Sequence, residues 1–340
     1  MTFPFFRVPQ IVQSIIVNLA EPYELICLTQ CSKRAYKLVK TYRKTSENVK
    51  IVVDIENTVK VYFDRKMSCR LSLDSKYGNQ ELARREYPTT NLFGADFCLS
   101  LFLSNIWKLK WDDPTTDGVL TLLDWVTDLF QVDVRGLDIS EDTVHRWKWV
   151  ESRQERIKSL YLSGGRYSKN DISNMIHSNS DNLLFMYITP RIEYSGILPS
   201  RTSFVSGNGF SFTRNPLMTS DFVHLSISDS TITDADVNQF LKHWLAGGNS
   251  RLKTASLPVD SRDLDDITYG IEGIHGNFET EVYWTIFGRK LTFYFRRLYL
   301  RRADGVMATC YIIENSCRRN EFVLAVWPDA KNNSCPIDIF

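Results

Sequence analysis

Residues 222–257 indicate the fold of this chain most clearly, and they read FVHLSISDSTITDADVNQFLKHWLAGGNSRLKTASL. Two short apolar-rich runs, 222–227 and 252–257, are typical of β-strands. Between them, residues 234–246 place apolar side chains at helical spacing and end at Gly247-Gly248, which stops a helix. Strand, helix and strand follow one another so closely that we expect neighbouring parallel strands here.

The same alternation extends toward the N-terminus. Strands are predicted at 132–134, 157–162 and 183–188, and helices at 119–130, 141–151 and 168–177. A strand–turn–helix unit repeated about every 25 to 30 residues is typical of leucine-rich-repeat solenoids. We therefore predict an α/β fold with an irregular, leucine-rich-repeat-like solenoid within 96–330. A doubly wound parallel sheet is the competing fold, but the sequence contains neither Gly-x-Gly-x-x-Gly nor a Walker loop.

Residues 280–327 predict an antiparallel β meander that closes one end of the solenoid. The Asp304-Gly305 step is a strong hairpin signal inside it. Arginines alternate with aromatic residues in this segment, and four of them form a candidate site for an acidic partner: Arg296, Arg297, Arg301 and Arg302. An edge strand protected by charge is the structural alternative. Single-stranded nucleic acid is a further, less favoured ligand.

The first forty-five residues predict three short helices. Pro9 opens the first and Pro22 the second, while Ser32 is a suitable N-cap for the third. A unit of this size buries little area by itself. It also carries more apolar side chains than three short helices hide from one another, and this surplus predicts a partner.

These residues resemble an F-box, with Val-Pro in place of the usual Leu-Pro start. The motif residues are Phe5 to Pro9, Ile15, Ile16, Leu19, Pro22, Glu24, Leu25, Leu28, Cys31 to Arg34, Leu38 and Val39. The resemblance implies docking to a Skp-type adaptor and, through it, to a cullin scaffold. The residues expected to make that contact are Val8, Pro9, Ile15, Ile16, Leu19, Leu25 and Leu28. A helical cap on the following domain is the alternative interpretation.

A second block, residues 236–252, resembles the core of the F-box-associated type 2 domain, which is abundant in nematode F-box proteins. The two resemblances imply an F-box at 1–45, a β-hairpin linker and loop at 46–95, and a substrate-binding body at 96–330. The body would contain the F-box-associated region at about 200–265. Within the linker, 49–55 and 59–63 predict the two strands of the hairpin.

Composition is that of a globular chain, with 43% apolar and 24% charged residues in 340, and a formal net charge of +1. The net charge gives no general affinity for nucleic acid. Seven cysteines without a regular spacing favour reduced thiols in a cytoplasmic or nuclear protein. We expect no signal peptide, because no charged leader precedes an apolar run at the start of the sequence, and no membrane span, because no apolar run is long enough. We expect no cofactor and no metal site.

Taken together, these features predict a substrate-recognition subunit of an SCF-type (Skp–cullin–F-box) ubiquitin ligase. It would bind an adaptor through the F-box and an unknown target through the body, and it would have no catalytic residues of its own. The five histidines fall in no catalytic motif. A protein-interaction scaffold without ubiquitin transfer, an RNA-binding protein that uses the basic C-terminal sheet, and a hydrolase are the alternatives.

Overall fold

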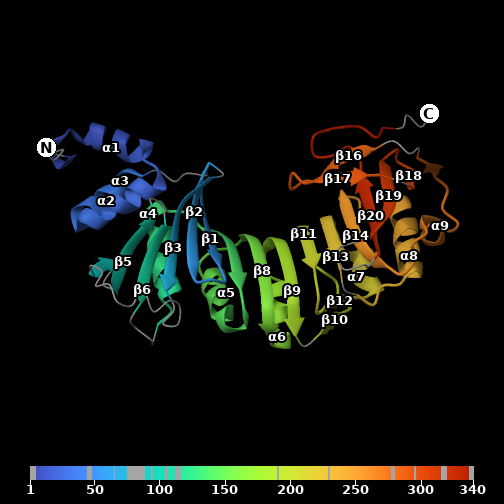
Figure 1. The fold of residues 1–340 in the computed structure, drawn as a ribbon, viewed down its shortest axis with the longest axis horizontal. Helices are drawn as coiled ribbons and strands as arrows, with labels where there is room; N and C mark the ends of the chain where they lie inside the picture. Colours follow the sequence, from blue (N-terminus) through green and yellow to red (C-terminus); the bar gives the residue numbers. More distant parts are fainter. Residues whose placement is uncertain are drawn as a thin grey trace. The chain divides into compact units, whose positions relative to one another are not determined.

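The computed structural model describes residues 5–43, 48–64, 66–74, 89–92, 95–103, 106–111, 116–189, 191–228, 230–276, 280–294, 296–314 and 320–336. The chain divides into two compact units, Met1–Lys158 and Ser159–Phe340. Figure 1 follows both units along the sequence. Both combine strands with helices, so the predicted mixed α/β class is confirmed.

The first unit begins with the three predicted helices. After a short 3-10 turn, η1 (Phe5–Arg7), these are α1 (Gln10–Leu19), α2 (Pro22–Cys31) and α3 (Lys33–Tyr42). Ser32 caps α3 by accepting a hydrogen bond from the backbone N–H of Ala35 at 3.0 Å. Val17, Leu25, Ile26, Ala35 and Val39 are fully buried and form the core of this helical module.

A mostly antiparallel sheet follows, with the strand order β7-β1-β2-β3-β6-β5-β4. The strands are β1 (Val49–Asp54), β2 (Thr58–Phe63), β3 (Lys66–Asp74), β4 (Thr89–Leu92), β5 (Ala95–Leu103), β6 (Ile106–Trp111) and β7 (Val134–Ile139). The predicted hairpin is confirmed as β1 and β2. Part of the stretch expected to be a loop, Thr89–Leu92, is instead a strand that pairs with β5; residues 75–88 lie outside the described residues. β3 and β6 pair in parallel. Strands on both sides of residue 95, the predicted boundary between the linker segment and the body, therefore belong to one sheet.

Two helices complete this unit close to the predicted positions. They are α4 (Gly118–Phe130) and α5 (Val144–Glu151), the latter preceded by the 3-10 turn η3 (Glu141–Thr143). Asp117 caps α4, because its side chain accepts a hydrogen bond from the N–H of Val119 at 2.8 Å. The strand expected at 132–134 starts only at its last residue and continues to Ile139.

The second unit contains a sheet with the order β15-β18-β19-β20-β14-β13-β11-β9-β8. Its first strands are β8 (Ile157–Arg166), β9 (Ser180–Thr189), β11 (Arg201–Ser206), β13 (Phe222–Ile227) and β14 (Thr254–Val259). From β9 to β14 these strands are parallel and lie in chain order. Among these strands there is no reversal of order, which a doubly wound sheet would have.

Helices and a core of aromatic residues cover one face of this sheet. The helices are α6 (Lys169–Ile176), α7 (Arg214–Thr219), α8 (Asp234–Leu245) and α9 (Leu264–Ile267). Phe204 and Phe185 are fully buried and pack against Phe210, which stacks on Phe185 at 4.7 Å between ring centroids. Phe210 belongs to β12 (Phe210–Phe212), which pairs with β10 (Ile192–Tyr194) in a small second sheet.

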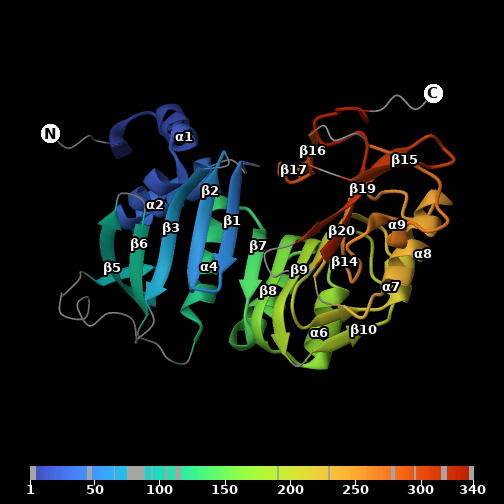
Figure 2. The same ribbon diagram turned by 45° about the vertical axis from the view of Figure 1, so that its right-hand side comes forward.

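The predicted C-terminal meander is confirmed for the strands between Arg297 and Val326, whereas the segments 281–284 and 290–293 pair with each other in a separate sheet. Its strands are β15 (Ile274–His275), β18 (Arg297–Arg301), β19 (Met307–Glu314) and β20 (Asn320–Val326), and β20 pairs antiparallel with β14. A separate hairpin, β16 (Glu281–Trp284) and β17 (Lys290–Phe293), packs on this sheet through Tyr283 and Phe293. Figure 2 shows α7 and α8 on one side of β14 and β20 and this hairpin on the other. None of the described helices is both long enough and apolar enough to cross a membrane.

Candidate protein-interaction sites

Helix α1 presents a row of exposed apolar side chains. Ile11 is 71% exposed, Ile15 52% and Leu19 79%, and their spacing of four residues places them on one face of the helix. The other face holds buried Val17 and Gln13, whose side-chain amide donates to the carbonyl of Val8 at 2.9 Å. Large exposed side chains in a row on one helix are typical of a contact surface. We call Ile11, Ile15 and Leu19 the α1 stripe.

The other residues predicted to contact an adaptor divide into two groups. Pro9 is exposed, and Val8, Ile16 and Leu28 are half-buried, so all four are accessible to some degree. Leu25 is fully buried beside Ile26 in the core of the module. Its side chain stabilises the helices and is not accessible to a partner, which corrects its predicted role. Ile11 was missed, although it lies one helical turn before Ile15.

The helical module is fixed to α4 by a polar contact. The hydroxyl of Tyr36 donates to a carboxylate oxygen of Asp128 at 2.5 Å, and the ammonium of Lys40 lies 2.6 Å from the same carboxylate. Burial acts to raise the pKa of Asp128, but the hydrogen bonds from Lys40 and Tyr36 outweigh it and the pKa is lowered. Tyr36 and Lys40 therefore hold the module to α4 by specific contacts. Within the module, buried Arg43 at the end of α3 donates to the carbonyls of Val17 and Ala20.

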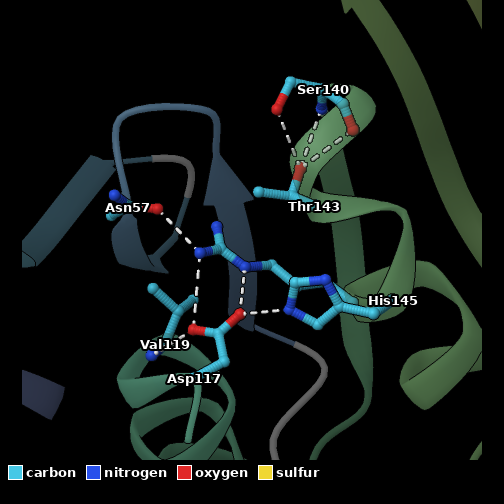
Figure 3. Close-up of polar contacts among 7 residues, drawn as sticks. Asn57, Asp117, Val119, Ser140, Thr143 and His145 are labelled. Atoms are coloured by element: carbon cyan, nitrogen blue, oxygen red, sulfur yellow. Dashed lines mark hydrogen bonds and ion pairs between the residues drawn. The ribbon is translucent and has the colours of Figure 1, made fainter. Parts of the chain in front are cut away.

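A second polar cluster joins three elements of the first unit (Figure 3). Arg146 on α5 donates to Asp117 at 2.6 Å and to Asn57 in the β1–β2 turn at 2.7 Å. His145 lies 2.7 Å from the same Asp117 carboxylate. Burial would raise the pKa of Asp117, but its bonds to Arg146, His145 and the N–H of Val119 lower it overall. The carboxylate is thus held in its charged form as the centre of a junction between β1–β2, α4 and α5.

An open pocket of about 530 Å³ lies beside this junction. Its lining includes Ile55, Ser140, Thr143 and Asp142, in addition to the junction residues. Both signs of charge are present, so the lining does not favour an anion over a neutral group. No sequence pattern predicts this cluster, because Asp117 and Arg146 are separated by 29 positions and belong to no local motif.

The four arginines predicted to bind an acidic partner do not form one surface. Arg297 is 2% exposed, and its guanidinium bonds Glu281 at 2.7 Å and the hydroxyl of Tyr299 at 2.7 Å. Arg302 is 6% exposed, pairs with Asp304 at 2.7 Å and lies over the ring of Trp244. Only Arg296 and Arg301 are exposed, and Arg296 lies 3.6 Å from Asp263.

Arg297 and Arg302 therefore join parts of the second unit to one another. They are not accessible to an acidic peptide or to nucleic acid, which corrects the prediction of a four-arginine site. Two of the arginines in the alternating basic and aromatic pattern are thus buried and paired with acidic residues. A sequence pattern does not distinguish such an arginine from a solvated one.

Comparison with known proteins gives two matches. A family model described as "F-box associated" matches residues 193–257, a segment that runs from β10 into β14. The chain therefore contains an F-box-associated segment. It overlaps the region predicted at about 200–265, and the strands of the C-terminal meander follow it.

A Caenorhabditis elegans protein described as "Skn-1 dependent zygotic transcript 15 protein" is 21% identical to this chain over 314 residues. The similarity covers 81% of this chain and 86% of that protein. It thus extends over both units described above. No solved structure matches.

Proposed function

We propose that this chain is a substrate-recognition subunit of an SCF-type ubiquitin ligase. Its N-terminal helices act as an F-box that binds a Skp-type adaptor, and its second unit binds a target protein. The chain contributes proximity between the target and the ubiquitin-carrying enzyme, and other subunits perform the chemistry. The F-box-associated segment at 193–257 supports this class of protein-interaction function.

The observation that carries the proposal is the α1 stripe. Ile11, Ile15 and Leu19 expose apolar area on a module whose own core is already filled by Val17, Leu25 and Val39. Exposed apolar side chains on an amphipathic helix are buried when that helix packs against partner helices. The module has the residue pattern of an F-box, so a Skp-type adaptor is the partner we propose.

We further propose that the parallel strands of the second unit are turns of an irregular solenoid. Strands β9, β11, β13 and β14 are neighbours in chain order, with α7 and α8 in the connections that precede and follow β13. In such an array each unit stacks on its chain neighbours, and one face of the sheet is available for another protein.

Co-expression with a Skp-type adaptor, followed by size-exclusion chromatography, tests the proposal. The unaltered chain should elute as an equimolar complex with the adaptor. The double variant Ile15→Asp with Leu19→Asp should remain folded and elute without the adaptor, since two carboxylates in an apolar interface are costly to desolvate. The matched control is Ser173→Asp on α6, which is also an exposed helical position.

Two outcomes would reject the proposal. In one, the unaltered chain is folded and does not bind the adaptor, which would leave the N-terminal helices as a cap of the first unit. In the other, the double variant binds as tightly as the control, which would place the adaptor on another surface.

A further inference from the structure

Helix α3 presents exposed basic side chains on the outside of the helical module. Lys33, Arg34 and Lys37 are all exposed and lie about one helical turn apart, whereas Val39 on the same helix is buried in the core. Arg7, in the turn before α1, is exposed as well. We call Arg7, Lys33, Arg34 and Lys37 the basic patch.

The charge of the basic patch is not balanced by acidic neighbours. In the part of the chain that the structure describes, no carboxylate forms an ion pair with any of its four side chains. Lys40 on the same helix differs, because it pairs with Asp128. Lys33 and Lys37 are four residues apart, and like charges at this spacing destabilise a helix. The patch therefore costs the free chain some stability, and carboxylates of a partner would offset that cost.

The basic patch lies beside the α1 stripe. At one end of the two helices, the guanidinium of Arg34 lies over the ring of Phe6, just before α1, at 4.7 Å from the ring centroid. At the other end, the side-chain amide of Asn18 on α1 donates to the carbonyl of Tyr42 on α3 at 3.0 Å. Helices α1 and α3 are therefore neighbours along their length. Since the stripe and the patch both face away from the core that these helices share, a partner that covers the stripe comes close to the patch.

We propose that the basic patch binds carboxylates of the same protein that covers the α1 stripe, so that this partner has acidic side chains beside an apolar groove. An apolar centre with a charged rim is the usual arrangement of a protein interface. Nucleic acid would neutralise the patch through its phosphates but would leave the stripe exposed. A helix that lies on an anionic membrane carries Lys and Arg on its polar face, whereas α1 contains no charged residue.

This inference rests on the proposed function, in which the protein that covers the α1 stripe is a Skp-type adaptor. Charges at the rim of an interface act mainly on the association rate, because they attract the partner before contact is made. The dissociation rate depends more on the apolar contacts at the centre. Salt screens the attraction between exposed charges beyond about 8 Å at physiological ionic strength. The basic patch therefore predicts that the adaptor associates more slowly as salt is added.

The test measures the association and dissociation rates of the adaptor on the immobilised full chain by surface plasmon resonance. Lys33→Glu with Lys37→Glu should slow association about tenfold at about 0.05 M salt and leave the dissociation rate nearly unchanged, and the difference should disappear at about 1 M salt. The control, Lys169→Glu with Lys242→Glu, makes the same change of net charge at two exposed helical positions of the second unit. It should associate as the unaltered chain does.

Circular dichroism establishes that each variant is folded, and Lys33→Gln with Lys37→Gln, which should slow association by a smaller factor, is a second measurement if the charge reversal is not.

The inference alone fails if the adaptor binds the unaltered chain and associates with the folded patch variants at the same rate, or if the control slows association equally. It also fails if the patch variants lose only binding to vesicles of phosphatidylcholine and phosphatidylserine, since the patch would then bind a membrane. An adaptor that does not bind the unaltered chain rejects the proposed function, and this inference with it.

Discussion

Lys40 on α3 and Asp128 on α4 lie 2.6 Å apart, and this ion pair connects the N-terminal helical module to the rest of its unit. Both side chains are about two-fifths exposed, at 42% and 40%, so the pair is screened by solvent and contributes modestly. Asp128 also accepts a hydrogen bond from the hydroxyl of Tyr36, which makes its carboxylate the common acceptor for two residues of α3.

The first prediction concerns this carboxylate and pH. The folded-state pKa of Asp128 is lowered, so its ionised form stabilises the protein above the unfolded-state value of about 4, and that contribution is lost as pH falls through the lower folded-state pKa. Asp128→Asn should therefore reduce the free energy of unfolding by about 1 kcal/mol at pH 7 and by less at low pH. Urea denaturation at both pH values checks this. A difference that stays constant with pH would contradict it.

The second prediction concerns the junction around Asp117. Arg146→Ala removes the main partner of a carboxylate whose side chain is only 15% exposed, and the cost should be about 3 kcal/mol of unfolding free energy. His145→Ala, at a position 51% exposed, should cost less than about 1 kcal/mol. Chemical denaturation of both variants makes the comparison. Equal effects would show that Arg146 does not organise the junction.

The third prediction separates structural from accessible arginines. Arg297→Met leaves Glu281 without its buried partner and should destabilise the protein by about 3 kcal/mol. Arg296→Met, at an exposed position, should change stability by less than about 0.5 kcal/mol. Thermal unfolding distinguishes the two. If Arg296→Met proved the more damaging, the assignment of burial in this segment would be in error.

The fourth prediction contrasts two leucines of the helical module. Leu25→Asp places a carboxylate in a fully buried site and should unfold the module, whereas Leu19→Asp affects a side chain that is 79% exposed and should leave it folded. Circular dichroism and limited proteolysis report the fold of each variant. On the proposed function, only the Leu19→Asp variant can test adaptor binding without loss of structure.

The elements that the sequence predicts well carry their own local signals. Helix α8 begins at a Thr233–Asp236 capping box and ends where Gly247 adopts a φ of +98°, and both signals lie within the segment itself. The β1–β2 hairpin is similarly defined by alternation on both sides of a turn.

What the sequence does not predict depends on contacts between distant residues. The F-box resemblance placed Leu25 among the partner-binding positions, and the sequence pattern could not correct this, because an apolar residue on a short helix has the same pattern whether it faces the core or a partner. The arginines of the C-terminal sheet were misjudged for the same reason. Their acidic partners, Glu281 and Asp304, are recognisable only once the strands and turns are in place.

The chain order of the parallel strands has a consequence for how the protein is made. Strands β9, β11, β13 and β14 each pair with a strand that has already been synthesised, so this part of the sheet can grow as the chain leaves the ribosome. The outer edge of β14 is different, because it is closed by β20, and the contact between Ser256 and Glu321 spans 65 positions. Until those later residues emerge, this edge of the nascent sheet has no strand to pair with, and an unpaired edge is a template for association with another chain.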